Sequence, residues 1–152
     1  LKVPAVFETL KFELDNDLLD KVVVFGYHTE PLTQLRQKLK GAGFDVGMIW
    51  GATPAKKRDA IVQHFKDPRG SRVLIANIVA AGVAIDLTAA HQGVMIEYDW
   101  VPGNNAQAMQ RMHRHGQDKP VSIRVATIPD SIDERINDVL DRKTRELTAL
   151  FD

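Results

Sequence analysis

Apolar residues along the chain form short continuous runs that alternate with segments of helical spacing. Residues 21–27 read KVVVFGY, a run rich in β-branched side chains that predicts a strand buried on both faces. Similar runs predict four more strands at residues 44–50, 72–76, 93–98 and 121–127. Strands of this kind, separated by helices, favour one parallel sheet.

Apolar side chains recur every three or four positions around these strands, which predicts helices at residues 4–14, 31–39, 54–65, 102–115 and 131–147. Gly41 and Gly43 end the second helix, Thr53 stands as the N-cap of the third, and Ser131 with Glu134 makes a capping box for the last. The expected fold class is α/β, a three-layer sandwich with a mainly parallel central sheet and helices on both faces. Ligands of such sheets bind at the carboxyl ends of the strands.

The composition is that of one folded domain. The 152 residues are 44 % hydrophobic and 26 % charged, and no apolar run approaches the roughly 20 residues that a membrane helix needs. The absence of cysteine excludes disulfides and thiolate chemistry. The chain begins with Leu1 rather than Met, so we expect it to be a piece of a longer polypeptide.

Twenty basic residues balance twenty acidic ones, but the two kinds are not mixed evenly. Residues 1–20 and 129–152 each carry a net charge of −3, whereas residues 54–72 carry +4 and residues 101–120 carry +2. A polyanion responds to the local field, so the two basic blocks are compatible with a nucleic-acid partner. The alternative is that each block is an ordinary solvated helix face.

The stretch QAMQRMHRHGQ at residues 107–117 carries the most chemistry. On the predicted helix Gln107, Arg111 and Arg114 share one face, because they are four and three positions apart. Two guanidinium groups one turn apart can bind one polyanion bidentately, which suits a transferring phosphoryl group. The alternative is again a solvated basic face.

This stretch resembles motif VI of the Swi/Snf family of superfamily two helicases and DNA translocases, which reads Gln-Ala-x-x-Arg-x-His-Arg-x-Gly-Gln. Trp100 and Pro102 precede it as the Trp-Asn-Pro of that family does, with Val101 at the Asn. The spacing is similar to that of the annealing-helicase branch. Residues 21–28 resemble motif IV, and residues 49–53 resemble the block that reads Asp-Gly-x-Thr.

Residues 76–90 resemble motif V, with several replacements. Asn77 stands at the first position of the Ser-Thr pair, Ala81 and Ala84 replace two glycines, Gly82 is kept, and Asp86 stands at an Asn. The resemblance extends over residues 20–147.

The resemblance implies a RecA-like second lobe of a two-lobe motor that binds ATP between its lobes. In such motors the first lobe supplies the phosphate loop and the acidic pair that holds Mg²⁺, and this chain contains neither G-x-x-x-x-G-K-[ST] nor Asp-Glu-x-His. We therefore expect residues 1–20 to be a lead-in helix or linker from a missing first lobe, and residues 21–152 to be the second RecA-like domain. The fragment alone is expected to be inactive. The expected partners are the first lobe and the DNA backbone, without sequence specificity and without a membrane.

The resemblance gives the catalytic roles to Arg114, as the main arginine finger, and to Arg111, as a second phosphate-sensing arginine. A surface ion pair is the alternative for each. Gln107 is expected to orient its helix or touch ATP, Asp86 to contact the ribose, and Gly82 to let nucleotide or DNA approach the backbone. The alternatives are a solvated amide for Gln107, a cap or turn residue for Asp86 and a turn glycine for Gly82.

Strand ends supply the residues that we expect to hold DNA phosphates through backbone amides or short polar side chains. These residues are Gly26, Tyr27, His28, Gly51, Thr53 and Asn77. Trp100 is expected to be a packing anchor beneath the motif VI helix rather than a base-stacking group. His113 and His115 diverge on a helix, so we expect no metal site.

Two functions remain open. The first is the second motor lobe of an ATP-dependent DNA helicase or translocase, which supplies arginine fingers and part of the DNA track. The alternative is a degenerate, non-catalytic module that keeps the fold and binds DNA or a partner, as the altered motif V favours. We expect a cytoplasmic protein of bacterial or phage origin, or a nuclear protein if the source is eukaryotic.

Overall fold

One parallel sheet organises the computed structural model, which describes residues 2–82, 85–129 and 131–150. Within these residues the strand order is β2-β3-β1-β4-β5, with β1 at the centre. The side chains of Val22, Phe25, Val73 and Ala76 are fully buried, as expected for strands covered on both faces. The strands are Val22–Gly26 (β1), Val46–Ile49 (β2), Val73–Asn77 (β3), Gln92–Met95 (β4) and Ser122–Val125 (β5).

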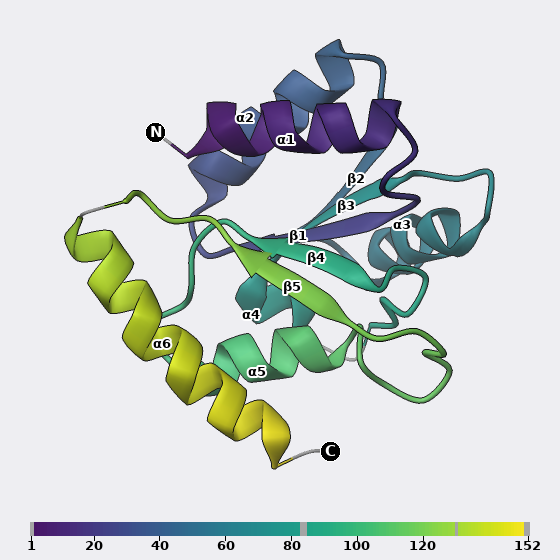
Figure 1. Cartoon of the computed structure of the whole chain (residues 1–152). Coiled ribbons are helices and arrows are strands. Elements are labelled where there is room, and N and C mark those ends of the chain that lie inside the picture. The colour runs from purple at the N-terminus through teal and green to yellow at the C-terminus, as the bar shows by residue number, and fades with distance from the viewer. Residues whose placement is uncertain (1, 83–84, 130, 151–152) are drawn as a thin grey trace.

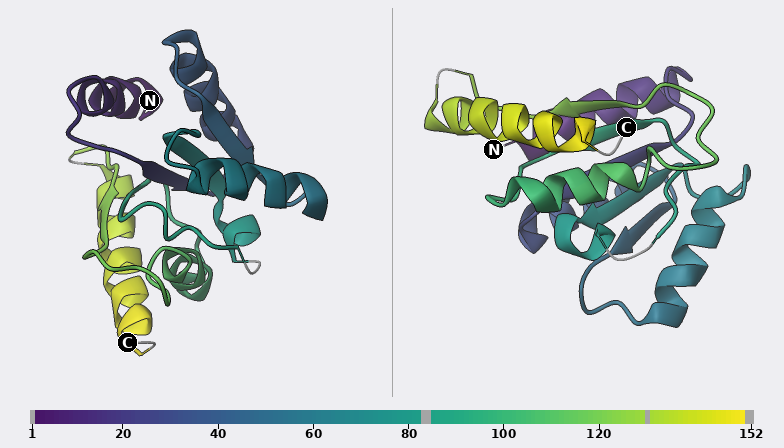
Figure 2. Two further views of the ribbon diagram at one scale, coloured as in Figure 1. Left: turned by 90° about the vertical axis from the view of Figure 1, so that its right-hand side faces the viewer. Right: turned by 90° about the horizontal axis from the view of Figure 1, so that it is seen from below.

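Helices cover both faces of this sheet (Figure 1). One face carries α1 and α2, and the other carries α3, α4, α5 and α6, as the side and bottom views in Figure 2 show. The α/β three-layer sandwich is therefore confirmed. The helices are Val3–Asp15 (α1), Thr29–Gly41 (α2), Ala55–Lys66 (α3), Ile78–Ala81 (α4), Pro102–Gln110 (α5) and Ile132–Ala149 (α6). None of the helices in the described part of the chain is long and apolar enough to cross a membrane.

The segment at residues 1–20 packs onto the sheet through α1. Val6, Leu10 and Leu14 are buried in one apolar cluster with residues of α2 and of the sheet face that α2 covers. Arg72, just before β3, donates to the carbonyl oxygen of Asp20 at 2.9 Å and so fixes the connection from α1 to β1. The expected helix is present, and its link to a first lobe stays a prediction.

Several helix ends follow the local sequence. α2 ends at Gly41, and Gly43 has a φ of +96°, which allows Phe44 N to donate to Leu39 O at 3.1 Å. The Oγ of Ser131 accepts from Glu134 N at 3.3 Å, as the capping box predicts. These residues begin or end their helices through contacts with near neighbours in the chain, so the sequence alone can place the helix ends.

Two predicted helix ends are wrong. α3 begins after Pro54 rather than at a Thr53 cap, because the Thr53 Oγ1 is buried and accepts from Trp50 N at 3.1 Å. α5 ends at Gln110 rather than His115. In a longer helix the Arg111 carbonyl would accept from the amide four residues on, but it accepts from Leu87 N at 2.9 Å instead. Arg114 therefore lies in a turn after the end of α5, although the predicted helix included it. Ala84, predicted to replace a motif V glycine, lies outside the described residues.

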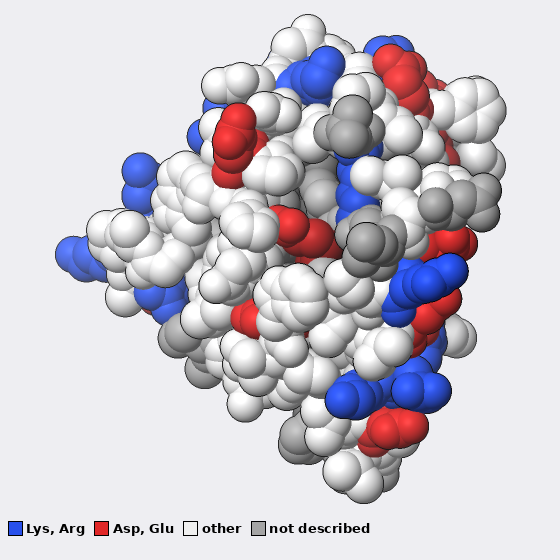
Figure 3. All heavy atoms as spheres, turned by 90° about the vertical axis from the view of Figure 1, so that its left-hand side faces the viewer, with Lys and Arg blue, Asp and Glu red and all other residues white. Residues whose placement is uncertain are grey.

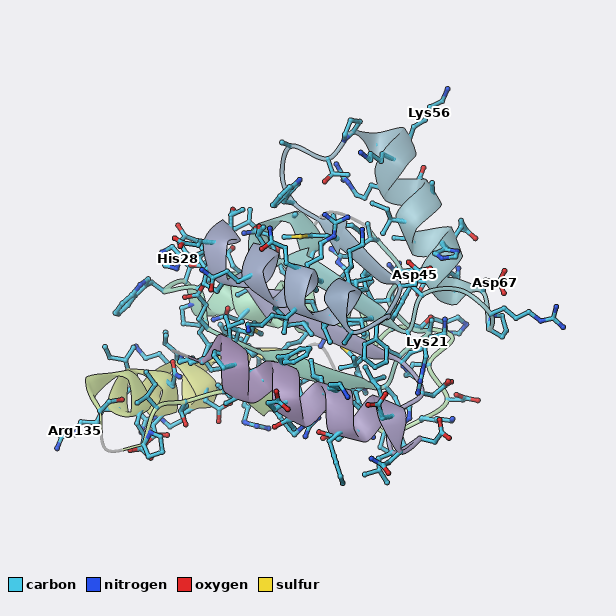
Figure 4. All side chains as sticks on the ribbon, turned by 90° about the horizontal axis from the view of Figure 1, so that it is seen from above. Lys21, His28, Asp45, Lys56, Asp67 and Arg135 are labelled. Atoms are coloured by element: carbon cyan, nitrogen blue, oxygen red, sulfur yellow. The ribbon has the colours of Figure 1, made fainter. Side chains whose placement is uncertain are left out.

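A buried ammonium group closes the sheet's amino edge. The Lys21 Nζ donates to the carbonyl oxygens of Phe65, of Asp67 at 2.8 Å and of Ser71 at 3.0 Å. Figure 4 shows Lys21 beside the loop that begins at Asp67. Burial lowers the pKa of Lys21. This one side chain thus connects β1 to the end of α3 and to the start of β3.

Replacing Lys21 by Met should lower the free energy of unfolding by about 2–4 kcal/mol, because at least two buried carbonyl oxygens lose their donor. Urea unfolding followed by circular dichroism measures this loss. Lys56→Met is the matched control, since Lys56 is exposed at the far end of α3, and its effect should stay within about 0.5 kcal/mol. Equal urea midpoints for the two variants would contradict the role given to Lys21.

Candidate functional site

The loops that follow β1, β3 and β4 are joined to one another at the carboxyl edge of the sheet. The Asn77 Nδ2 donates to Tyr27 O at 2.7 Å. The backbone N and the ring Nδ1 of His28 lie 2.6 and 2.9 Å from the two carboxylate oxygens of Glu97. Because β1 lies between β3 and β4, these contacts fasten three neighbouring strand ends into one surface. Seen from this side, the middle of the molecule is largely uncharged (Figure 3).

The two motif VI arginines bind the loop of motif V. Arg111 donates through Nη2 to Gly82 O at 2.7 Å, and Arg114 donates through Nη1 to Ile85 O at 3.0 Å. Both arginines therefore reach the loop that follows β3 and α4, although Arg114 does not share a helix with Arg111. The structure brings together the two segments that the sequence predicts to act together.

Gln117 extends this contact along the same loop. Its Nε2 points at three carbonyl oxygens, those of Ala90 at 2.9 Å, Met112 at 3.1 Å and Thr88 at 3.3 Å. Sequence reasoning includes Gln117 in motif VI but gives it no task. Its position after Gly116, which has a φ of +105°, is the signal that the chain turns back here.

The two guanidinium groups lie close enough to repel each other. Burial first, and then the charge of Arg114, lower the pKa of Arg111. Both side chains nevertheless remain charged at neutral pH, because a guanidinium is too basic to lose its proton there. The Arg111 Nε is buried and has no partner among the described residues. Two adjacent cations with an unused donor favour an anion between or beside them.

Gly82 approaches Gln107 rather than open solvent. It follows α4 with a φ of −67°, which any residue can adopt, so a left-handed turn does not explain it. A Cβ at this position would lie 3.3 Å from Gln107 Oε1 and 3.3 Å from Val79 O. The close packing is between motif V and α5, and the contacts of Gly82 and Gln107 with ATP stay predictions.

Asp86 is the centre of a turn. Its Oδ1 accepts from Thr88 N at 2.9 Å and from Thr88 Oγ1 at 2.6 Å, and its Oδ2 accepts from Lys66 Nζ at 3.2 Å. Burial raises the pKa of Asp86, but these hydrogen bonds outweigh burial and leave the pKa below its usual value. The geometry matches the turn-residue alternative, and a ribose contact stays a prediction.

Five of the six residues expected at DNA phosphates are either exposed or buried, and the sixth, Asn77, is half-buried. Tyr27, His28 and Gly51 are exposed at the carboxyl edge. Gly26 is buried, and a Cβ there would lie 2.8 Å from Leu32 Cδ2, so this glycine makes room for α2 rather than for a ligand. Thr53 is buried as well, and contacts of these two residues with DNA phosphates stay predictions.

Asn77 is engaged within the chain. Besides its contact with Tyr27, its Oδ1 accepts from Val79 N at 3.0 Å and from Ala80 N at 3.2 Å, so it is the N-cap of α4. Its side chain thus has partners for both of its polar atoms before any DNA arrives. A direct contact of Asn77 with a phosphate stays a prediction.

Trp100 is 66 % exposed, so the expectation that it packs beneath motif VI is wrong. The cause is the preceding residue. Asp99 is buried, its Oδ1 accepts from Val101 N at 2.9 Å, and its Oδ2 accepts from Asn104 Nδ2 at 2.9 Å. This turn directs Trp100 away from the core. The sequence analysis singles out neither Asp99 nor Glu97. An Asp that binds the amide two residues further on is a typical turn signal, and this signal identifies Asp99.

No group of three or more histidine and acidic side chains suited to a metal ion occurs in the described part of the chain. The polar groups that converge on the motif V loop are instead the guanidinium groups of Arg111 and Arg114 and the amide of Gln117. Such groups bind phosphate or carboxylate oxygens rather than a metal.

Known proteins are similar to this chain over most of its length. The family profile of the helicase conserved C-terminal domain matches residues 5–116. The ATP-dependent helicase rhp16 of Schizosaccharomyces pombe is 30 % identical over 151 residues, which are 99 % of this chain and 18 % of that protein. A putative SWI/SNF-related matrix-associated actin-dependent regulator of chromatin subfamily A member 3-like 1 of Arabidopsis thaliana is 34 % identical over 152 residues, 99 % of this chain and 17 % of that protein.

Among solved structures, the C-terminal part of the Fun30 ATPase domain matches with a TM-score of 0.81 and 27 % identity, over 91 % of this chain and 44 % of that one. The chain spans less than a fifth of the length of the two curated relatives. Both named organisms are eukaryotes, so these relatives do not support the expected bacterial or phage origin. The annealing-helicase branch stays a prediction.

The profile matches about three quarters of the chain, and the parallel sheet with its paired motifs V and VI agrees with it. This chain therefore belongs to the helicase conserved C-terminal domain family, as a C-terminal RecA-like lobe of the Swi/Snf type.

Proposed function

We propose that this chain is the second motor lobe of an ATP-dependent DNA helicase or translocase. The observation that carries the proposal is the convergence of Arg111 and Arg114 on the motif V loop, on the face of the sheet that α5 covers. Two adjacent cations there suit the negative charge of a nucleotide phosphate.

The two arginines differ in the freedom that they have. Arg111 is half-buried and tied to Gly82 O, so it supplies a charge whose position is fixed. Arg114 is exposed and makes one hydrogen bond to Ile85 O, so it can turn toward a phosphate by giving up that bond. This difference supports Arg114 as the main finger and Arg111 as the second, sensing arginine.

ATP fits the donors that are present, since guanidinium groups and amides bind phosphate oxygens. In this proposal Arg111, Arg114 and Gln107 face the nucleotide. The phosphate loop and the acidic pair for Mg²⁺ come from a first lobe. The fragment alone is then inactive, because it holds neither the metal nor the attacking water.

The DNA track in this proposal runs along the carboxyl edge of the sheet, over Tyr27, His28 and Gly51. The exposure of Trp100 favours the role that the sequence ranks second, contact with a base, because an indole face can stack on any base without reading sequence. The names of the relatives, one of them a regulator of chromatin, favour the nucleus as the location.

One observation favours the alternative, a module that binds DNA or a partner without ATP. Asn77 stands where the family has the Ser-Thr pair, and both of its polar atoms are already used in the N-cap and in the contact with Tyr27. A side chain occupied in this way offers less to a ligand than a free hydroxyl. The following experiment separates the two functions.

Arg114→Ala, in a polypeptide that joins this lobe to a first RecA-like lobe, should lower DNA-stimulated ATP hydrolysis about a thousandfold or more, the range typical of a lost arginine finger. DNA affinity should change less than about twofold, because Arg114 lies at the phosphate site. Arg69→Ala is the matched control, since Arg69 is exposed in the loop between α3 and β3, outside motifs V and VI. Unchanged hydrolysis in Arg114→Ala would favour the non-catalytic module.

The isolated 152-residue chain should bind labelled oligonucleotides at 50 mM salt and lose most of that affinity at 200 mM, since half a track makes few phosphate contacts. Trp100→Ala should weaken binding at low salt by about tenfold, as expected for a lost stacking platform. Fluorescence polarisation with duplex and single-stranded probes measures both effects. Phe12→Ala is the control, because Phe12 is 62 % exposed but lies on α1. Equal affinities of the two variants would remove Trp100 from the track.

A further inference from the structure

The outer edge of β2 is open within the described chain. β2 is the last strand on its side of the sheet and pairs with β3 alone. Alternate residues of a strand direct their N–H and C=O groups to opposite sides, so β2 has backbone donors and acceptors on the side away from β3. An edge of this kind is a template for another strand.

A groove of about 580 Å³ lies over this edge between α2 and α3. Val46, Gly47 and Met48 of β2 form its floor, Arg36 and Lys40 of α2 line one wall, and Lys57, Ala60 and Ile61 of α3 line the other. Figure 4 shows the two helices diverging, with Asp45 at one end of the groove and Lys56 pointing away from it at the far end of α3.

The walls of the groove carry cations that lack partners. The side chains of Arg36, Lys40 and Lys57 form no hydrogen bond or ion pair with any residue that the structure describes, and the Arg36 Nε is buried without an acceptor. The acid among the lining residues, Asp45, lies 2.5 Å from His64 Nε2. The groove is therefore positively charged along both walls and open to an anionic group.

We propose that this groove binds an acidic peptide segment in extended conformation, which adds to the sheet as a strand beside β2. A peptide backbone offers alternating donors and acceptors to the β2 edge. The sugar–phosphate backbone of DNA offers acceptors and no donors for the outward carbonyl oxygens. The edge thus favours a peptide, and the cations select an acidic one.

The two walls also determine where the acids belong. α2 and α3 lie on opposite faces of the sheet. Side chains of an added strand alternate between these faces, so acids that meet both walls occupy positions of both parities. Two acids two positions apart would meet Arg36 and Lys40, and one acid at a neighbouring position would meet Lys57.

The test uses the 152-residue chain and a fluorescein-labelled peptide of eight residues, with Glu at positions 3, 4 and 6 among Val and Thr. We expect saturable binding in fluorescence polarisation. Lys57→Glu and Lys40→Glu should each weaken it at least tenfold. Lys56→Glu makes the same charge change one position away, outside the groove, and should weaken binding less than twofold.

Two further peptides test the strand itself. A peptide with the same sequence and N-methylated amides at alternate positions keeps the charge but cannot form the ladder, and it should bind at least tenfold more weakly. Equal binding of the methylated peptide, or equal effects of Lys56→Glu and Lys57→Glu, would overturn the proposal. It would also be overturned if a duplex oligonucleotide bound with the same Lys57 dependence while the peptide did not bind.

Discussion

Hydrogen bonds from side chains after α5 to carbonyl oxygens after α4 are the contact on which the rest of the site depends. In the described part of this loop, residue 82 and residues 85–90, the backbone is irregular, so its carbonyl groups need donors from elsewhere in the chain. Arg111, Arg114 and Gln117 supply these donors. In return, Leu87 N donates a hydrogen bond to Arg111 O. This bond ends α5 at Gln110. The loop and the helix end therefore determine each other.

The same contact gives the proposed motor lobe a way to couple nucleotide binding to the hydrogen bonds that hold the motif V loop. A phosphate oxygen is a stronger acceptor for a guanidinium than a neutral carbonyl oxygen is. When a nucleotide engages Arg114, Ile85 O loses its donor, and the loop loses one of the bonds that hold it. The loop follows α4, whose N-cap Asn77 also holds Tyr27 on the exposed edge. A change at the phosphate site thus has a covalent and hydrogen-bonded route to the surface that we propose contacts DNA.

The sequence predicts the strands well because their signal is local. The run at residues 21–27 is continuous and β-branched, and Val22–Gly26 is indeed buried. The predictions are wrong where residues distant in the chain determine the local structure. The hydrogen bond from Leu87, in the neighbouring loop, ends α5. The large indole of Trp100 suggests core packing, but the turn at the buried Asp99 directs it outward. Motif spacing finds the arginines but cannot show that their present partners are carbonyl groups.

The open edge of β2 also bears on how copies of this chain behave toward one another. Formal charges sum to zero, so general repulsion between molecules at neutral pH is weak. A bare strand edge under those conditions invites sheet-to-sheet aggregation. Lys40 and Lys57 flank that edge, and a second copy that docked there would bring its own pair against them. Repulsion between the two pairs of lysines would disfavour pairing of two lobes through their sheet edges.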